Sequence, residues 1–597
     1  MFKRPLLYLM YRNATLKWLE KEGIDSKNVR FHYPWSKGSG YEEPYIAVCD
    51  SEPVFDKDKY VCIHRSNHFS LYEKKTLKNA HLLRQSFSKS LQTNLLVQIR
   101  KWAAESCAGE KLSQILPAVR EKFKVQLEEQ CTVDVSVWVD GQLRGSIVQQ
   151  GTLINSIKRA SKLVVADPRY KSLKPDDLLR ARFELVVVPD VWIAYHVQSD
   201  ESMEGDVAMR LSYKGKRLGW FVPPVANQRA FKTVGEYLGA LSRKSGVEHI
   251  DSRYIKFEMA RALSCIESVS SKEVLPLRGA VPLAQEGSLN EKKIATNIVR
   301  AIDEDGYLCN VKEPGQEEVK SLDLVRQAMC TAALAEYHVY SNDSDVLDVI
   351  QKSAVFILKH INNLPEAQIS RVLSVSYLTQ TQALTGYDFK VSSESLQHDI
   401  GNLQVASEGE IIYQIQRVKA CVLAGVAVDT QRTTFHIHTK MLYKRWLSET
   451  EPDPVVYADL LILLHSARMK EEYKFFRNWL TGLQSEVGSF KCKHEPYVRG
   501  VGKIAEAFAS VPDSSLVIQS ALGWLSCMQY TEETMYHIPV SDRYRFDGGF
   551  RHDYWDRSLW IDGSAHVLLA LIRGRYAQTY ISRLQKCLQI YGHDLPG

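Results

Sequence analysis

The spacing of apolar residues changes along this chain, and that change restricts its fold more than any other feature. From about residue 290 onward, apolar residues recur at the spacing of amphipathic helices, with no fixed repeat length between successive segments. Between about 91 and 230, helix-like segments alternate with strand-like ones. The pattern therefore predicts a multidomain protein in which an α+β part precedes an all-α part.

The chain has 597 residues, which is too long for one hydrophobic core and typical of about two to four domains. We predict a small α/β extension over 1–90, an α+β domain over 91–230, a connecting segment over 231–289 and a helical domain over 290–597. Because 45% of the residues are hydrophobic and 24% are charged, we expect all of these regions to fold.

Charge and cysteine content exclude several classes of protein. The net charge of +6, from 76 basic and 70 acidic residues, is a small excess that does not indicate nucleic-acid binding. Eleven cysteines without a C-x-x-C motif indicate reduced thiols rather than a disulfide framework. The short uncharged run at 5–11 cannot span a bilayer. We therefore expect a cytoplasmic protein whose partners include neither nucleic acid nor a membrane.

The helical region contains segments that match a known architecture. VRQAMCTAALAEYHVYSNDSDVLDVIQKSAVFIL, at 325–358, enters a helix through Arg326 and Gln327, makes an acidic turn and continues as a second helix. This pattern resembles the helical pairs of (α/α)6 toroids, and the end of the sequence is similar to the last hairpin of such a ring. The resemblance implies a central pit surrounded by loops, with Arg326 and Gln327 among its substrate-binding residues. The alternative is that these two residues only form an ion pair at the start of the helix.

RFDGGFRHDYWDRSLWIDGSAH, at 545–566, is the strongest candidate for lining that pit. Asp562 and His566 are four residues apart on a predicted helix and therefore share a face, as an acid–base pair would require. The alternative is that Asp562 caps the helix, His566 lies in the core and Gly548-Gly549 only turns the chain. The remaining candidates in the stretch are Asp547 and Asp553 for catalysis, and Arg551, His552 and Trp555 for substrate binding.

The α+β region carries a second set of candidates. LRGSI, at 143–147, is followed by a helix and by ADPRYKSLKPDDLLRARFELVVVPD, at 166–190. This order resembles the AMMECR-type domain, whose hairpin strand carries L-R-G-C-I-G. Ser146 stands where the family has cysteine and Val148 where it has glycine. The resemblance implies a ligand pocket lined by Arg144, Ser146 and Asp167, unless these residues only shape a hairpin and a turn.

We expect neither a metal nor a cofactor. His436 and His438, which we place on a strand, and Cys492 and His494 lack the spacing of a structural zinc site. The G-x-G-x-x-A match at 500–505 has no apolar strand before it, as nucleotide binding would require.

Three functions remain open from the sequence. The first is an enzyme, or a degenerate enzyme, that processes a carbohydrate or another polymer, and 29 tyrosines and 11 tryptophans suit stacking on sugar rings. The second is a non-catalytic partner in a multi-component biosynthetic or modification pathway, with a sugar, polymer or peptide-like ligand. The third is acyl or amide transfer by Ser146, for which His196 is the candidate base.

Overall fold

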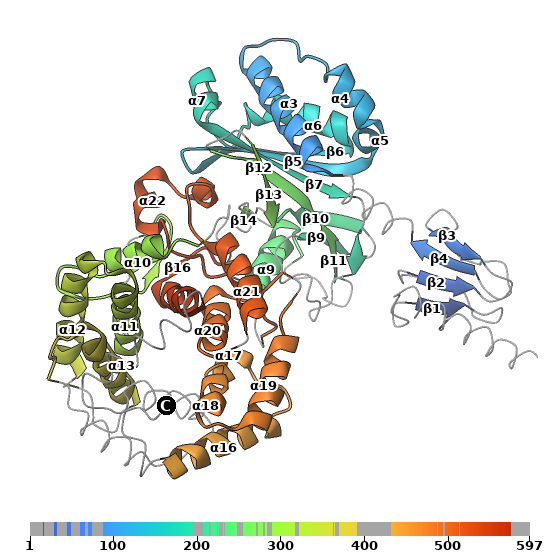
Figure 1. Ribbon diagram of the computed structural model, residues 1–597. Helices are drawn as coiled ribbons and strands as arrows, with labels where there is room; N and C mark the ends of the chain where they lie inside the picture. Colours follow the sequence, from blue (N-terminus) through green and yellow to red (C-terminus); the bar gives the residue numbers. More distant parts are fainter. Residues whose placement is uncertain are drawn as a thin grey trace, which may run out of the picture.

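The structure is a computed structural model that describes four strands between residues 29 and 74 and then, with short gaps, residues 87–390 and 432–574. Figure 1 shows a mixed α+β part followed along the chain by a large helical part, as the sequence predicts. The first four strands form a sheet of order β1-β2-β4-β3. These strands are β1 (Val29–His32), β2 (Tyr45–Val48), β3 (Tyr60–Arg65) and β4 (Ser70–Lys74).

A six-stranded sheet of order β14-β13-β12-β7-β5-β6 is the centre of the α+β part. Its strands are β5 (Gln130–Val139), β6 (Gln142–Thr152), β7 (Ala181–Pro189), β12 (Leu263–Glu267), β13 (Val274–Arg278) and β14 (Val281–Pro282). The β5–β6 hairpin turns at Asp140 and Gly141, both at positive φ, as a tight hairpin turn requires. The helices of this part are α3 (Lys89–Cys107), α4 (Pro117–Lys122), α5 (Lys124–Glu128), α6 (Leu153–Val164) and α7 (Pro175–Arg180).

The two faces of this sheet have different neighbours. Val133, Val135 and Val137 of β5 pack with α3 and α6 in one apolar core. Because side chains alternate along a strand, the residues between these valines point to the opposite face. Those residues are Asp134 and Ser136, and both are buried, so the opposite face carries polar groups inside the protein.

A second sheet, of order β10-β9-β11-β8, completes the α+β part. Its elements are β8 (Ile193–Ala194), β9 (Val207–Tyr213), β10 (Lys216–Phe221), β11 (Ile255–Arg261) and the helix α9 (Val234–Lys244). Strands β11 to β14 fall within 231–289, where the sequence suggests a connecting segment. The α+β part therefore continues to Pro282, because pairing between distant strands leaves no sign in local periodicity.

The helical part consists of helices that pack in neighbouring pairs, such as α11 with α12 and α20 with α21. Its elements are α10 (Glu291–Arg300), α11 (Leu324–Ser341), α12 (Leu347–Ile361), α13 (Ile369–Thr385), α16 (Arg432–Ser448), α17 (Pro454–Tyr457), α18 (Leu460–Ser466), α19 (Lys470–Gly482), α20 (Val498–Ala509), α21 (Ser515–Met528), α22 (Val540–Phe546) and a last helix over residues 561–574. The predicted helix at 410–429 lies outside the described residues, so closure into a toroid stays a prediction.

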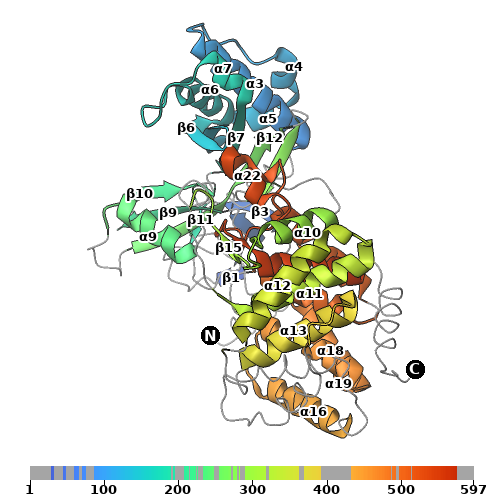
Figure 2. The same cartoon turned by 90° about the vertical axis from the view of Figure 1, so that its left-hand side faces the viewer.

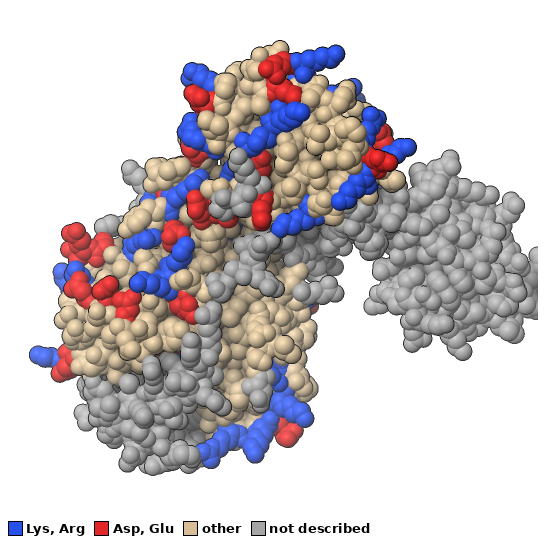
Figure 3. Space-filling view, turned by 45° about the horizontal axis from the view of Figure 1, so that its top comes forward, with Lys and Arg blue, Asp and Glu red and all other residues tan. Residues whose placement is uncertain are grey.

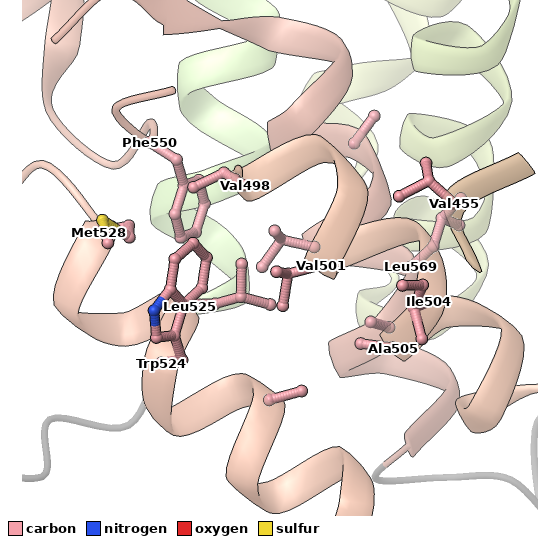
Figure 4. Packing of buried hydrophobic residues seen from close by; sticks show 14 of the residues in the cluster. Val455, Val498, Val501, Ile504, Ala505, Trp524, Leu525, Met528, Phe550 and Leu569 are labelled. Atoms are coloured by element: carbon pink, nitrogen blue, oxygen red, sulfur yellow. The ribbon is translucent and has the colours of Figure 1, made fainter. Parts of the chain in front are cut away.

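The last helix lies in the centre of the helical core. Leu569 lies beside Ile504 of α20, and Val501 of α20 with Trp524 and Leu525 of α21 belong to the same apolar cluster (Figure 4). All five side chains are buried. A polar residue on the last helix must therefore find its partner inside the protein. Within the described ranges, no helix combines the length and apolar character needed to cross a membrane.

A loop of the helical part docks on the sheet of the α+β part. Glu533 accepts hydrogen bonds from Arg182, with a distance of 2.9 Å between Arg182 Nη2 and Glu533 Oε2. The ring of Tyr536 meets that of Trp138 edge to face at 5.3 Å. In Figure 2, α22 lies just below the same sheet. The two parts are thus joined by a mostly buried ion pair and an aromatic contact.

Candidate functional site

Asp562 organises the strongest candidate site, and its side chain is 2% exposed. It lies in the first turn of the last helix, where the helix dipole favours a negative charge. Its backbone N–H donates to Asn310 Oδ1. Its Oδ2 lies 3.3 Å from Arg326 Nε and 3.6 Å from Arg499 Nη1. One buried carboxylate therefore holds two arginines.

The two arginines reach this point from different helices. Arg326 lies in the first turn of α11 and Arg499 in the first turn of α20, and their side chains are 30% and 34% exposed. Arg326 also pairs with Asp323 and lies over the ring of Trp560, 5.2 Å from its centroid. Because each arginine side chain keeps about one third of its surface in solvent, the arginines remain partly available to an anion.

His552 and Asp553 form a hydrogen-bonded pair at the same site. His552 Nδ1 is 2.8 Å from Asp553 Oδ2. Asp553 Oδ1 accepts from the backbone N–H groups of Trp555 and Asp556, which fixes the carboxylate. Burial lowers the pKa of His552, but the hydrogen bond to Asp553 and the nearby charges of Asp553, Asp556 and Asp562 reverse this, so its pKa is raised. The site therefore stabilises the protonated form of His552.

Aromatic rings connect these groups. The ring of Tyr497 stacks on that of His552 with centroids 5.3 Å apart, and the centroid of the Trp560 ring lies 5.1 Å from that of His552. Trp560 is fixed because β16 (Leu559–Trp560) pairs with β15 (Val311–Lys312). We define the Asp562 cluster as Asp562, Arg326, Arg499, His552, Asp553, Tyr497 and Trp560.

His566 shares a helix face with Asp562 but has different partners. Its Nδ1 lies 2.6 Å from Glu506 Oε2 of α20. Arg573 binds the other oxygen of Glu506 at 2.9 Å and also binds Glu336 of α11 at 2.6 Å. We call His566, Glu506, Arg573, Glu336 and Gln380, which donates to Glu336, the Arg573 network. The structure therefore brings His566 to this network and not to a pair with Asp562.

Asp547 lies apart from the Asp562 cluster. Its carboxylate is 4.0 Å from both Lys293 and Arg300 of α10, which places it at the contact between α10 and α22. The candidate residues of the 545–566 stretch therefore do not all lie in one site. Of its four candidate catalytic residues, Asp553 and Asp562 belong to the Asp562 cluster.

Three predicted substrate-binding residues point into the protein. Gln327 Nε2 donates to Gly306 O at 2.5 Å and to Ser353 Oγ. Arg551 donates to the backbone carbonyls of residues 553 and 554 and so braces the loop that carries His552. Trp555 is buried against the ring of Tyr237. A role of these side chains in binding a substrate stays a prediction.

In the α+β part, Ser146 contacts two carboxylates. Its backbone N–H donates to Asp167 Oδ2 and its hydroxyl donates to Asp134 Oδ1, both at 3.0 Å. Arg144 donates instead to the backbone carbonyl of Lys171. Ser146 and Asp167, which the sequence places in one candidate pocket, are thus in direct contact. His196, the candidate base, lies outside the described residues.

Several candidate functional residues were not predicted from the sequence. Arg499 and Tyr497 sit just before a predicted helix, and only their closeness to the pit of a toroid could have marked them. Asp134 had a clearer signal, because it is an acidic residue in the apolar run 132–139. Such a residue must be buried with a partner or protonated.

The described residues contain no group of His, Cys, Asp and Glu side chains able to hold a metal ion. His436 lies in the helix α16 and not on a strand, so that part of our expectation is wrong. Residues 432–448 form a helix because they mix apolar and basic side chains without the alternation that is typical of a strand. His494 lies outside the described residues.

Comparison with known proteins shows no family for this chain. No family model matches it, and no curated protein matches it. Among solved structures, the uncharacterized protein PH0010 from Pyrococcus horikoshii is 16% identical, with 32% of this chain and 99% of that chain covered and a TM-score of 0.27. An unsaturated glucuronyl hydrolase specific for heparin is 10% identical, with 48% and 96% covered and a TM-score of 0.38.

Both TM-scores are low, so neither likeness carries an argument about function. The resemblances to the AMMECR-type domain and to the toroid therefore stay predictions. Any assignment of function to this chain must rest on the geometry of its own residues.

Proposed function

We propose that the helical part binds an acidic carbohydrate, or a similar anionic polymer, at the Asp562 cluster and processes it by acid–base chemistry. One observation carries this proposal: a buried carboxylate holds two arginines, each about one third exposed, beside a tryptophan ring. On the upper part of the face in Figure 3, basic and acidic side chains of the described residues lie interspersed.

The cluster suits a carboxylated sugar because it combines two kinds of contact. A guanidinium presents paired N–H donors that match the two oxygens of a carboxylate. The rings of Trp560 and Tyr497 supply flat apolar area on which a sugar face can stack. A neutral sugar would gain the stacking without the charged contacts, and we therefore expect it to bind more weakly.

His552 is the acid–base group of this proposal. Asp553 fixes its Nδ1, and Nε2 has no hydrogen-bond partner among the residues that the structure describes. An imidazole held in this way can give or take a proton at a glycosidic oxygen. Asp553 then orients the histidine, and Asp562 holds the arginines. The candidates Asp547 and His566 gain no support from the geometry.

Binding of oligogalacturonate, measured by titration calorimetry, tests the proposal. Neutral cello-oligosaccharide of equal length is the matched ligand. We expect Arg326→Ala and Arg499→Ala each to weaken oligogalacturonate binding at least about tenfold, since a hydrogen bond to a charged group contributes about 1.5–3 kcal/mol. Arg120→Ala, on the exposed side of α4, serves as the control and should bind like the wild type.

The same titrations separate the alternatives. Equal binding of acidic and neutral sugars, or variants that bind like Arg120→Ala, would contradict the anionic-sugar site. Binding without any cleavage of the oligomer would favour the second candidate function, a non-catalytic subunit that presents a polymer to a partner protein. A cytoplasmic location remains a prediction under both functions.

A further inference from the structure

The face of the central sheet that points away from α3 and α6 carries a row of polar side chains. Ser136 of β5 stands opposite Ser146 of β6 on one side and opposite Glu184 of β7 on the other. Asp134 lies two residues along β5 and therefore points to the same face. Asp134, Ser136 and Glu184 are buried, while Ser146 is partly exposed. We call these four residues the Ser146 row.

Asp134 accepts hydrogen bonds from both serines. Ser146 Oγ donates to Asp134 Oδ1 at 3.0 Å, and Ser136 Oγ donates to Asp134 Oδ2 at 3.2 Å. Burial raises the pKa of Asp134 to about 6, while the two hydroxyls and Arg169 oppose that rise and Asp167 adds to it. At neutral pH the group is a carboxylate that takes up a proton more readily than an exposed aspartate.

Glu184 supplies an independent sign that the row receives a ligand. Its side chain is fully buried, and Trp138 Nε1 donates to Oε2 at 2.8 Å. Burial raises the pKa of Glu184 to about 8, the indole N–H and Arg182 oppose that rise, and Asp134 adds to it. The carboxyl is therefore protonated at neutral pH. Its Oε1 has no hydrogen-bond partner among the described residues, although buried polar atoms normally have one.

We propose that the Ser146 row is an acyl-transfer site, separate from the Asp562 cluster, in which Ser146 is the nucleophile and Asp134 its base. Its substrate class is an activated acyl compound, such as an ester or a thioester. The geometry meets the requirement for an activated nucleophile, because the serine hydroxyl already donates to the group that must take its proton. This inference does not depend on the proposed function of the helical part.

The reaction balances with these groups and water. Ser146 Oγ attacks the carbonyl carbon and forms a new C–O bond, and its proton moves to Asp134. The bond between that carbon and the leaving oxygen or sulfur breaks, and the leaving group departs with the electron pair and takes the proton from Asp134. Water then attacks the acyl-serine, which releases the carboxylic acid and restores the hydroxyl.

Neighbouring groups hold Ser146 in place for this step. Its backbone N–H is bound by Asp167, and its backbone carbonyl accepts from Arg169. Arg169 also binds Asp167 Oδ2 at 2.7 Å, so the strand, the loop and the arginine form one connected unit. Asp167 and Arg169 are therefore positioning residues.

The test is acetylation of the full chain by p-nitrophenyl acetate. The initial release of p-nitrophenolate gives the rate, and peptide mass spectrometry locates the acetyl group. We expect an acetyl group on Ser146 in the wild type and none at this position in Ser146→Ala. Asp134→Asn should slow the reaction at least about 100-fold, the lower limit for loss of a general base. Ser106→Ala is the control, because the Ser106 hydroxyl donates to a backbone carbonyl.

The pH dependence of the wild type keeps the proposal testable even if Asp134→Asn does not fold. Acetylation of Ser146 should rise with pH and level off above about 6, as Asp134 loses its proton. An acetyl group found only on other residues, or a rate unchanged in Ser146→Ala, would overturn the proposal. A rate that grows with hydroxide and has no inflection near pH 6 would also overturn it. None of these outcomes bears on the binding of oligogalacturonate, so the two proposals are tested independently.

Discussion

The helical core and the Ser146 row hold buried carboxylates in opposite ways. In the helical part, Asp562 is held beside Arg326 and Arg499, and the carboxylates of the Arg573 network share a guanidinium. In the α+β part, hydroxyl and indole groups meet Asp134 and Glu184, and burial raises the pKa of both. Ion pairing keeps a carboxylate charged, whereas burial without a cation makes it hold its proton.

This difference separates two kinds of chemistry. A carboxylate that is neutralised by partly exposed arginines creates a place for a competing anion, which is why we assign anion binding to the helical part. A carboxylate that titrates near neutral pH can accept or donate a proton, which is why we assign proton transfer to the Ser146 row. We therefore expect the free energy of unfolding to respond differently when a cation is removed from the helical part and when a titrating carboxyl is removed from the α+β part.

The largest effect is expected when the cation of the Arg573 network is removed. Arg573→Ala leaves Glu336 and Glu506 buried without their arginine, and loss of one partner from a buried ion pair costs about 3–5 kcal/mol. Thermal unfolding followed by circular dichroism should show a drop of many degrees in the midpoint. Arg120→Ala, at an exposed position, is the control. A midpoint within a degree of the wild type would show that this network is not held by charge.

A second effect, which depends on pH, is expected for Glu184→Gln. The folded pKa of Glu184, about 8, is above its ordinary value of 4.5, so the folded state binds the proton more tightly than the unfolded state between these pH values. The wild type should therefore lose stability as pH rises from about 4.5 to 8, by up to about 1.4 kcal/mol per pH unit. Glutamine stays neutral and should remove this loss.

The measurement is the thermal midpoint of both proteins from pH 5 to pH 9. We expect the variant to gain on the wild type steadily as pH rises toward 8, because only the wild type must ionise a buried group. Parallel curves would show that Glu184 titrates like an exposed glutamate and that the α+β part does not differ from the helical part in this respect.

Local patterns predicted the elements that depend on local physics. The 3.6-residue period located α11, α12, α20 and α21, and Asp140-Gly141 located the hairpin turn. The strands β11 to β14 were missed for two reasons. Strands β11 and β12 pair with β9 and β7, which lie far away in sequence, while β13 and β14 are short.

The candidate site was predicted only in part for a similar reason. Asp562, Arg326 and His552 were selected because of their charge and position in two resembling segments. The spacing of Asp562 and His566 predicted a common face correctly, but it could not show that α20 places Glu506 beside His566 and Arg499 beside Asp562. Those contacts depend on how α20 packs against the last helix, which no single segment encodes.

The central claim is that the Asp562 cluster, and not the rest of the surface, receives an anionic sugar. A crystal structure of the protein with bound trigalacturonate tests it most directly. We predict that a sugar carboxylate lies within hydrogen-bond distance of Arg326 and Arg499, with a sugar ring against Trp560. A trigalacturonate bound elsewhere, with both arginines still held only by Asp562, would contradict the account.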